Sequence, residues 1–156
     1  MTASVPEQNQ APVCRGESLL RTGVEILLSS GASVRVSGEC MSPLIPEASS
    51  VEVKICDAAS VRPGDVVLMQ RGTVFVLHRY IGRMAPPDGP MLLTKADKSR
   101  RPDNPWPPAA LVGKLTRTRT GEGWCDYTPG ILRRTASAAY GLLWRIFLKV
   151  KGPVRP

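Results

Sequence analysis

Hydrophobic residues first recur at helical spacing near the start of the chain, and this pattern predicts an N-terminal helix. The segment 16–30, GESLLRTGVEILLSS, carries apolar residues three, four and seven positions apart: Leu19, Leu20, Val24, Leu27 and Leu28. Gly31 follows directly and can end the helix, since glycine readily adopts the left-handed conformation found after helices. Residues 1–14 are polar and contain proline, and we interpret them as a flexible tail.

From residue 33 onward the pattern changes to a period of two, which is typical of half-buried β-strands. Strands are predicted at 33–37 (SVRVS), 50–55 (SVEVKI), 66–70 (VVLMQ), 73–81 (TVFVLHRYI), 91–95 (MLLTK) and 111–120 (LVGKLTRTRT). The turn signal VRPGD precedes the third strand, and Arg71-Gly72 joins the third to the fourth as in a hairpin. Residues 83–90 are read as a loop, and 96–108 as a long polar loop with four prolines, a kind of loop that is often functional.

A second helical pattern lies at the C-terminal end. Thr128 can cap this helix, Pro129 suits its first turn, and Gly152-Pro153 can end it. An apolar stripe runs along it, formed by Leu132, Ala136, Ala139, Tyr140, Leu143, Phe147 and Val150. Two interpretations stay open: the stripe packs on its own domain, or it lies on a membrane surface or a partner. The domain division is therefore a tail at 1–14, a β domain at 15–125 and a basic amphipathic helix at 126–156.

Positive charge is concentrated in two segments of the chain. The net charge is +8, with seven Lys or Arg in residues 95–119, and six with no acidic residue in residues 131–156. This bias suits an anionic partner such as a lipid surface, an acidic peptide or a nucleic acid. The longest uncharged stretch near the C-terminus, TASAAYGLLW, has ten residues, about half of what a membrane span needs. We expect a cytoplasmic protein, with membrane association as an option.

The cysteines and the single histidine limit the chemistry that the chain can perform. There are four cysteines with no C-x-x-C pair, and His78 is the only histidine, which argues against a zinc site. We expect reduced thiols, no metal and no cofactor. A thiol, an imidazole and a carboxylate can together perform nucleophilic catalysis. Cys40 with His78 and either Asp97 or Asp103 can supply these three roles.

Five segments then resemble, in the right order, the signal-peptidase and LexA-like serine peptidase superfamily. SGECMSP resembles its nucleophile box G-x-S-M-x-P, with Cys40 where the family has serine. RPGDVVLM is similar to the family's Gly-Asp strand entry, and VLHRYIG to the V-V-H-R-V-I-G segment of the eukaryotic and archaeal type, in which histidine is the general base. LLTKADKSRRPD resembles L-T-K-G-D-N-N…D, and LVGKL resembles the closing strand V-V-G-R-V.

The resemblance covers residues 33–116 and implies a compact LexA/signal-peptidase-like β-fold with specific residue roles. Cys40 is expected to attack, His78 to act as the base, and Asp103, with Asp97 close behind, to orient His78. The backbone N–H of Cys40, helped by Ser42 or Ser37, is expected to bind the oxyanion, with Met41 in support. The sequence departs from the family at the serine, at the loop glycine (Ala96 here) and at a Gly-Asp pair after the nucleophile.

The resemblance favours an endopeptidase that removes a leader or another peptide segment through a Cys-His(-Asp) mechanism. Its substrate would be an extended peptide or protein segment with small side chains near the cut. Two alternatives stay open: a non-catalytic module of the same fold that binds a peptide or partner, and a LexA-like regulator. The regulator would bind nucleic acid, a partner that we do not expect, because only about 32 residues precede the first strand.

Overall fold

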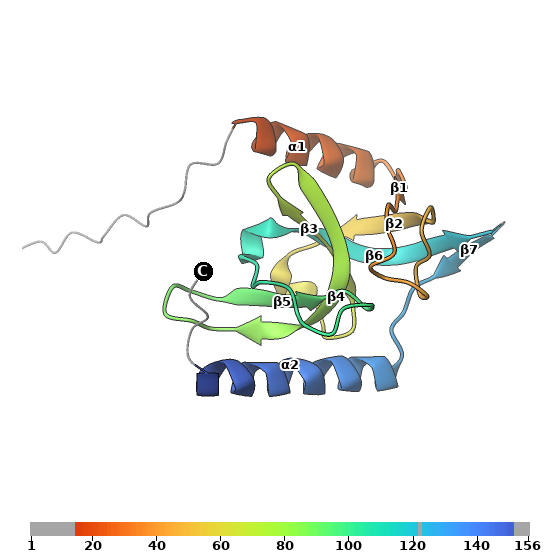
Figure 1. The fold of residues 1–156 in the computed structure, drawn as a ribbon. Coiled ribbons are helices and arrows are strands. Elements are labelled where there is room, and N and C mark those ends of the chain that lie inside the picture. The colour runs from red at the N-terminus through yellow and green to blue at the C-terminus, as the bar shows by residue number, and fades with distance from the viewer. Residues whose placement is uncertain (1–14, 122, 152–156) are drawn as a thin grey trace, which may run out of the picture.

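The structure, a computed structural model, describes residues 15–121 and 123–151, and an antiparallel sheet of seven strands dominates it (Figure 1). The strands are β1 (Val34–Arg35), β2 (Ser50–Ile55), β3 (Val66–Arg71), β4 (Val74–Met84), β5 (Met91–Lys95), β6 (Leu111–Thr120) and β7 (Gly123–Asp126). Their order is β1-β2-β6-β3-β4-β5, and β7 pairs with the second half of β6. Helices α1 (Arg15–Ser29) and α2 (Ile131–Lys151) lie on opposite sides of the sheet. The expected mainly β fold with a helix at each end is confirmed.

The strands lie close to the predicted ranges where one or both of their faces are buried. β2 and β5 have the predicted bounds, and β3 and β4 form the predicted hairpin. Two predictions were wrong. β4 continues to Met84, into the segment read as a loop, and β7 was not predicted, because its residues are exposed or only half-buried and show no alternation. Two short 3₁₀ helices, Ala58–Ser60 and Pro108–Ala110, also interrupt the connections.

Strand β3 is buried on both faces and divides the hydrophobic core into two clusters. Val66 and Leu68 pack in one cluster, and Val67 and Met69 pack in the other. Because alternate side chains on a strand point to opposite faces, the continuous apolar run of β3 marks a strand that is covered on both sides. The first cluster also contains Met41 and Ile45, both fully buried, so the turn that carries Cys40 is anchored in the core.

Helix α2 packs on β4 with small residues instead of its large apolar residues. Ser137 and Gly141 are buried, and a Cβ added at Gly141 would overlap the backbone oxygen of Ile81. The predicted stripe faces away, since Leu132 is 82% and Leu143 66% exposed. Packing of this stripe on its own domain is therefore wrong, because the close approach of α2 to β4 leaves no space for leucine side chains. The helix also begins at Ile131, two residues after the predicted start.

No helix within residues 15–121 and 123–151 has the length and apolar character needed to cross a membrane.

The two helices offer a matched pair of glycine substitutions that tests the close contact between α2 and β4. In an open helical position Gly→Ala stabilises by about 1 kcal/mol. Gly23 of α1 is such a position, since an added Cβ meets nothing within 4 Å. We expect Gly23→Ala to raise the free energy of unfolding, and Gly141→Ala to lower it by about 1–3 kcal/mol. Urea unfolding measures both, and stabilisation by Gly141→Ala would contradict the packing described.

Candidate active site

Cys40 lies in a tight turn between β1 and β2. Backbone hydrogen bonds within the turn and packing in the hydrophobic core hold this turn in place. Gly38 precedes it with φ 89°, a conformation that favours glycine. The N–H of Ser42 donates to the oxygen of Glu39 at 3.0 Å, and the N–H of Ile45 to the oxygen of Met41 at 3.0 Å. Since the side chains of Met41 and Ile45 are fully buried, the turn presents Cys40 in a half-buried position.

His78 is fixed by Asp103, one of the two carboxylates that the sequence offered for this role. Its Nδ1 lies 2.7 Å from Oδ2 of Asp103. The hydroxyl of Thr94 on β5 donates to the same oxygen at 2.5 Å, and the N–H of Asp103 donates to the oxygen of Thr94 at 2.9 Å. With Asp103 ionised, the ring proton belongs on Nδ1, and Nε2 is left with a lone pair that can accept a proton.

The surroundings of Asp103 keep it ionised. Burial raises the pKa of a carboxyl group, but hydrogen bonds from His78 and Thr94 outweigh burial and lower the pKa of Asp103 below its ordinary value. Thr94 is fully buried and was not singled out from the sequence. A hydroxyl-bearing residue near the end of a buried strand, followed by a loop with two aspartates, is the signal that could have identified it.

Asp97, the second candidate carboxylate, bonds to Arg79 and not to His78. Its two oxygens accept from Nε and Nη2 of Arg79 at 2.7 and 2.6 Å. Nη1 of Arg79 donates to the oxygen of Gly64 and to the hydroxyl of Tyr127, both at 2.8 Å. Desolvation lowers the pKa of this guanidinium, but its hydrogen bonds to Asp97 and Tyr127 raise it above the ordinary value. Asp97 thus compensates a buried cation, which is a structural role.

Consecutive residues of β4 explain why the loop carries two acids. His78 and Arg79 point to opposite faces of the strand. His78 meets Asp103 and Arg79 meets Asp97, so the segment between these two acids reaches both faces of β4. The same segment contacts the Cys40 turn, because the N–H of Lys98 donates to the oxygen of Cys40 at 3.0 Å and its ammonium pairs with Glu39. One loop therefore connects all three candidate catalytic residues.

The thiol of Cys40 is protonated in the resting protein. Burial raises its pKa above the ordinary value of 9.0, and the negative charges of Asp103 and Asp97 raise it further. The backbone N–H groups of Cys40 and Met41 act in the opposite direction, because they hydrogen-bond the charged sulfur. The net result is a neutral thiol that needs a base when it attacks.

The expected supporting residues lie around this turn in different environments. The side chain of Met41 belongs to the core, so its backbone N–H, and not its side chain, faces the sulfur. Ser42 is half-buried and precedes Pro43 through a cis peptide bond, and Ser37 is exposed. In the described part of the chain no group of three or more His, Cys, Asp or Glu side chains is arranged to hold a metal ion.

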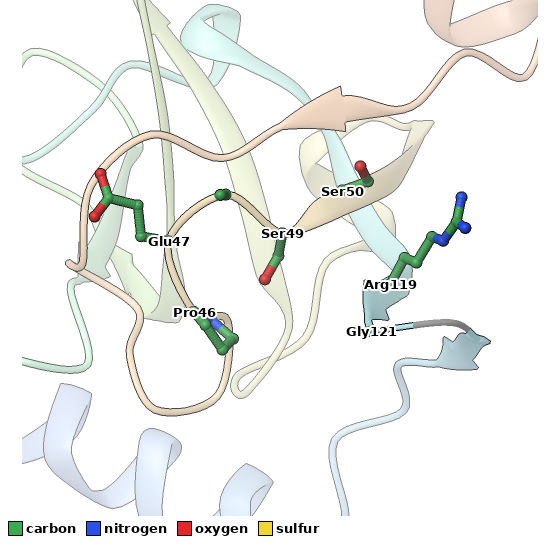
Figure 2. Close-up of a pocket in the computed structure, with 7 residues that line it drawn as sticks. Pro46, Glu47, Ser49, Ser50, Arg119 and Gly121 are labelled. Carbon is green, nitrogen blue, oxygen red and sulfur yellow. The ribbon is translucent and has the colours of Figure 1, made fainter.

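A polar pocket of about 250 Å³ lies beside the segment that follows the Cys40 turn (Figure 2). Figure 2 shows Glu47 and Arg119 on opposite sides of it, with Ser49 between them. Its lining residues are Pro46, Glu47, Ala48, Ser49, Ser50, Arg119 and Gly121. The lining includes none of the three candidate catalytic residues, so this pocket is separate from the site described above.

Comparison with models of known protein families gave no match, and comparison with curated protein sequences gave no significant relative.

The assignment of Asp97 to Arg79 predicts a large stability cost when this pair is broken. Asp97→Asn leaves the guanidinium of Arg79, which is 8% exposed, without a carboxylate. We expect the free energy of unfolding to fall by about 2–4 kcal/mol, as measured by urea unfolding. Glu52→Gln is the matched control, because Glu52 pairs with the more exposed Arg117 and its loss costs about 1 kcal/mol or less. Equal effects of the two substitutions would show that the Arg79–Asp97 pair contributes no more to stability than the more exposed Arg117–Glu52 pair.

The raised pKa of Cys40 predicts how its alkylation depends on pH. Only the thiolate reacts with iodoacetamide, so a raised pKa makes Cys40 slow at neutral pH and moves its rate increase to a pH above 9.0. Asp103→Asn removes one of the charges that raise this pKa and should speed alkylation below that pH by about two- to fivefold. Asp126→Asn, at an exposed carboxylate, is the control. Peptide mass spectrometry follows Cys40 separately from the other thiols. Fast alkylation of Cys40 at neutral pH would contradict a protonated thiol.

Proposed function

We propose that this chain is a cysteine endopeptidase in which Cys40 is the nucleophile, His78 the general base and Asp103 the residue that orients the base. The observation that carries the proposal is the position of Asp103. It accepts a hydrogen bond from Nδ1 of His78 at 2.7 Å, and its charge also acts on the thiol of Cys40. A neutral thiol and an imidazole that both interact with the same carboxylate fit general-base activation.

The reaction follows from these roles. Nε2 of His78 takes the proton of the Cys40 thiol while Sγ attacks the peptide carbonyl carbon, and the carbonyl oxygen becomes an oxyanion. The backbone N–H of Cys40, with that of Met41 or a hydroxyl of Ser42 or Ser37, binds this oxyanion. The C–N bond then breaks, and His78 returns the proton to the leaving amine. Water, deprotonated by His78, hydrolyses the thioester and restores the thiol.

The positions of the five resembling segments add support. They fall on the Cys40 turn, the start of β3, β4, β5 with its following loop, and β6. The four strands β6, β3, β4 and β5 are consecutive neighbours in the sheet. Segments that are scattered along 84 residues of sequence, 33–116, therefore gather in one region. This is the arrangement that a LexA/signal-peptidase-like peptidase would need, and on this basis the substrate is an extended leader or peptide segment with small side chains.

We also propose that cleavage takes place in the cytoplasm. In the described part of the chain the cysteines Cys40, Cys56 and Cys125 are free thiols. A free nucleophilic thiol suits a reducing compartment, in which it is not lost to oxidation.

A non-catalytic module that binds peptides is the second candidate, and one observation favours it. Burial and two carboxylates raise the pKa of Cys40, whereas many cysteine nucleophiles lie in surroundings that lower the pKa of their thiol. Such a module would retain a peptide without cutting it.

Cleavage of a pool of fluorescence-quenched peptides with alanine, glycine and serine around the central bond tests the proposal. We expect cleavage by the full chain, and a loss of about 10²-fold or more in kcat/KM for Cys40→Ala and for His78→Ala. Cys40→Ser should retain a small residual rate, because a hydroxyl is a weaker acid than a thiol. Cys125→Ala is the matched control, because Cys125 is exposed and lies on β7.

Three outcomes distinguish the alternatives. Full activity of Cys40→Ala would exclude the proposed nucleophile. Peptide binding without cleavage by the wild-type chain, unchanged in Cys40→Ala, would instead support the binding module. A trapped thioester on Cys40, seen by mass spectrometry after acid quenching, would confirm the covalent step.

A further inference from the structure

The outward face of α2 has no role in the proposed chemistry. The face that packs on β4 consists of small residues around Ser137 and Gly141. Large apolar side chains point the other way: Ile131 is 83% exposed, Leu132 82%, Leu142 51%, Leu143 66% and Ile146 51%. They extend over about four turns of α2, the helix that lies along one side of the sheet (Figure 1). An apolar surface of this kind marks an interaction site.

Exposed cations lie beside this face in the described part of the chain, and the helix itself carries no acid. Residues 127–156 contain six Lys or Arg and no Asp or Glu. Arg133 is exposed on α2. The loop after β5 brings two more exposed arginines, Arg100 and Arg101, to the side of the helix, because the hydroxyl of Tyr140 donates to the backbone oxygen of Arg100 at 2.8 Å. The apolar face thus has a cationic border formed from two separate segments.

Helix α1 provides a contrast within the same chain. It also exposes apolar residues, with Leu19 72% and Ile26 64% exposed. Its charges are mixed, since Glu17 and Glu25 accompany its arginines, and Arg21 is paired with Glu25. The combination of an exposed apolar face with a helix that contains no acidic residue is therefore a property of α2.

We propose that α2 lies on the surface of an anionic lipid membrane, parallel to it, with its outward apolar face at the boundary of headgroups and acyl chains. The arginines at its border would then contact lipid phosphates, as in other basic amphipathic helices at membrane surfaces. A second copy of the chain is a poorer occupant, because pairing two such faces would bring their cations together. A lipid surface also accepts a convex helix without a complementary groove. The inference does not depend on the proposed peptidase activity.

Vesicle flotation tests this inference on the full chain. We expect binding to vesicles of phosphatidylcholine with about one-third phosphatidylserine, weaker binding to phosphatidylcholine alone, and weakening by salt. The double variant Leu143→Asp, Ile146→Asp should bind at least about tenfold more weakly. Leu19→Asp, Ile26→Asp is the matched control: it makes the same two changes at similarly exposed positions on α1 and should bind much as the wild type does. Since both variants gain two negative charges, a difference between them reports on the face of α2.

A charge variant tests the cationic border separately. Arg100→Ser, Arg101→Ser should weaken binding to the anionic vesicles and leave binding to pure phosphatidylcholine unchanged. All substituted side chains are exposed, and circular dichroism verifies that each variant is folded.

Four results would overturn the inference. The first is no binding of the wild type to anionic vesicles, and the second is an equal loss in the α1 and α2 variants. The third is a dimer, seen by light scattering, that only the α2 variant dissociates, because a second copy would then cover the face. The fourth is binding to polyglutamate but not to vesicles, which would indicate an acidic protein partner.

Discussion

The guanidinium of Arg79 is the point at which the separate parts of the molecule meet. It is a buried cation, and such a charge is unfavourable unless it is paired and fully hydrogen-bonded. Four acceptors satisfy it: both oxygens of Asp97, the backbone oxygen of Gly64 and the hydroxyl of Tyr127. These partners come from the loop after β5, the entry to β3 and the segment before α2. The requirement to satisfy a single charge on β4 therefore fixes three connections.

The position of the candidate site depends on this arrangement. Because Asp97 is held by Arg79, the following residues can bond Cys40 through Lys98 and His78 through Asp103. Asp103 has two opposing effects on the proposed chemistry. It accepts a hydrogen bond from Nδ1 of His78, which leaves Nε2 as the nitrogen that can accept a proton, and its charge raises the pKa of Cys40. The raised pKa keeps the thiol neutral at neutral pH, so the proposed peptidase would activate its nucleophile as a serine peptidase does, without a preformed thiolate.

The sequence predicts the elements well wherever burial is one-sided or complete along a strand. β2 alternates and β3 is continuously apolar, and both lie where they were expected. β7 was not predicted, because an edge strand that is largely exposed shows no alternation of apolar and polar residues. Local pattern also could not choose between Asp97 and Asp103, since the choice depends on how the loop passes the two faces of β4. Alternation alone shows that His78 and Arg79 face opposite sides of the strand. Which residue each of them contacts depends on the tertiary structure.

Helix α2 shows a different limit of sequence patterns. A periodic apolar stripe predicts that one face of a helix will be removed from water, but it does not say by what. Here the size of the side chains determines which face of α2 packs on the sheet, because only a residue without a Cβ fits against the backbone oxygen of Ile81. The leucines are thereby left outside, where each exposed apolar side chain costs hydration free energy unless something covers it. A glycine in a helix interior is itself unfavourable by about 1 kcal/mol. The close packing of α2 on β4 accounts for this glycine. The exposed leucines are the remaining cost, and the proposed lipid surface would remove it.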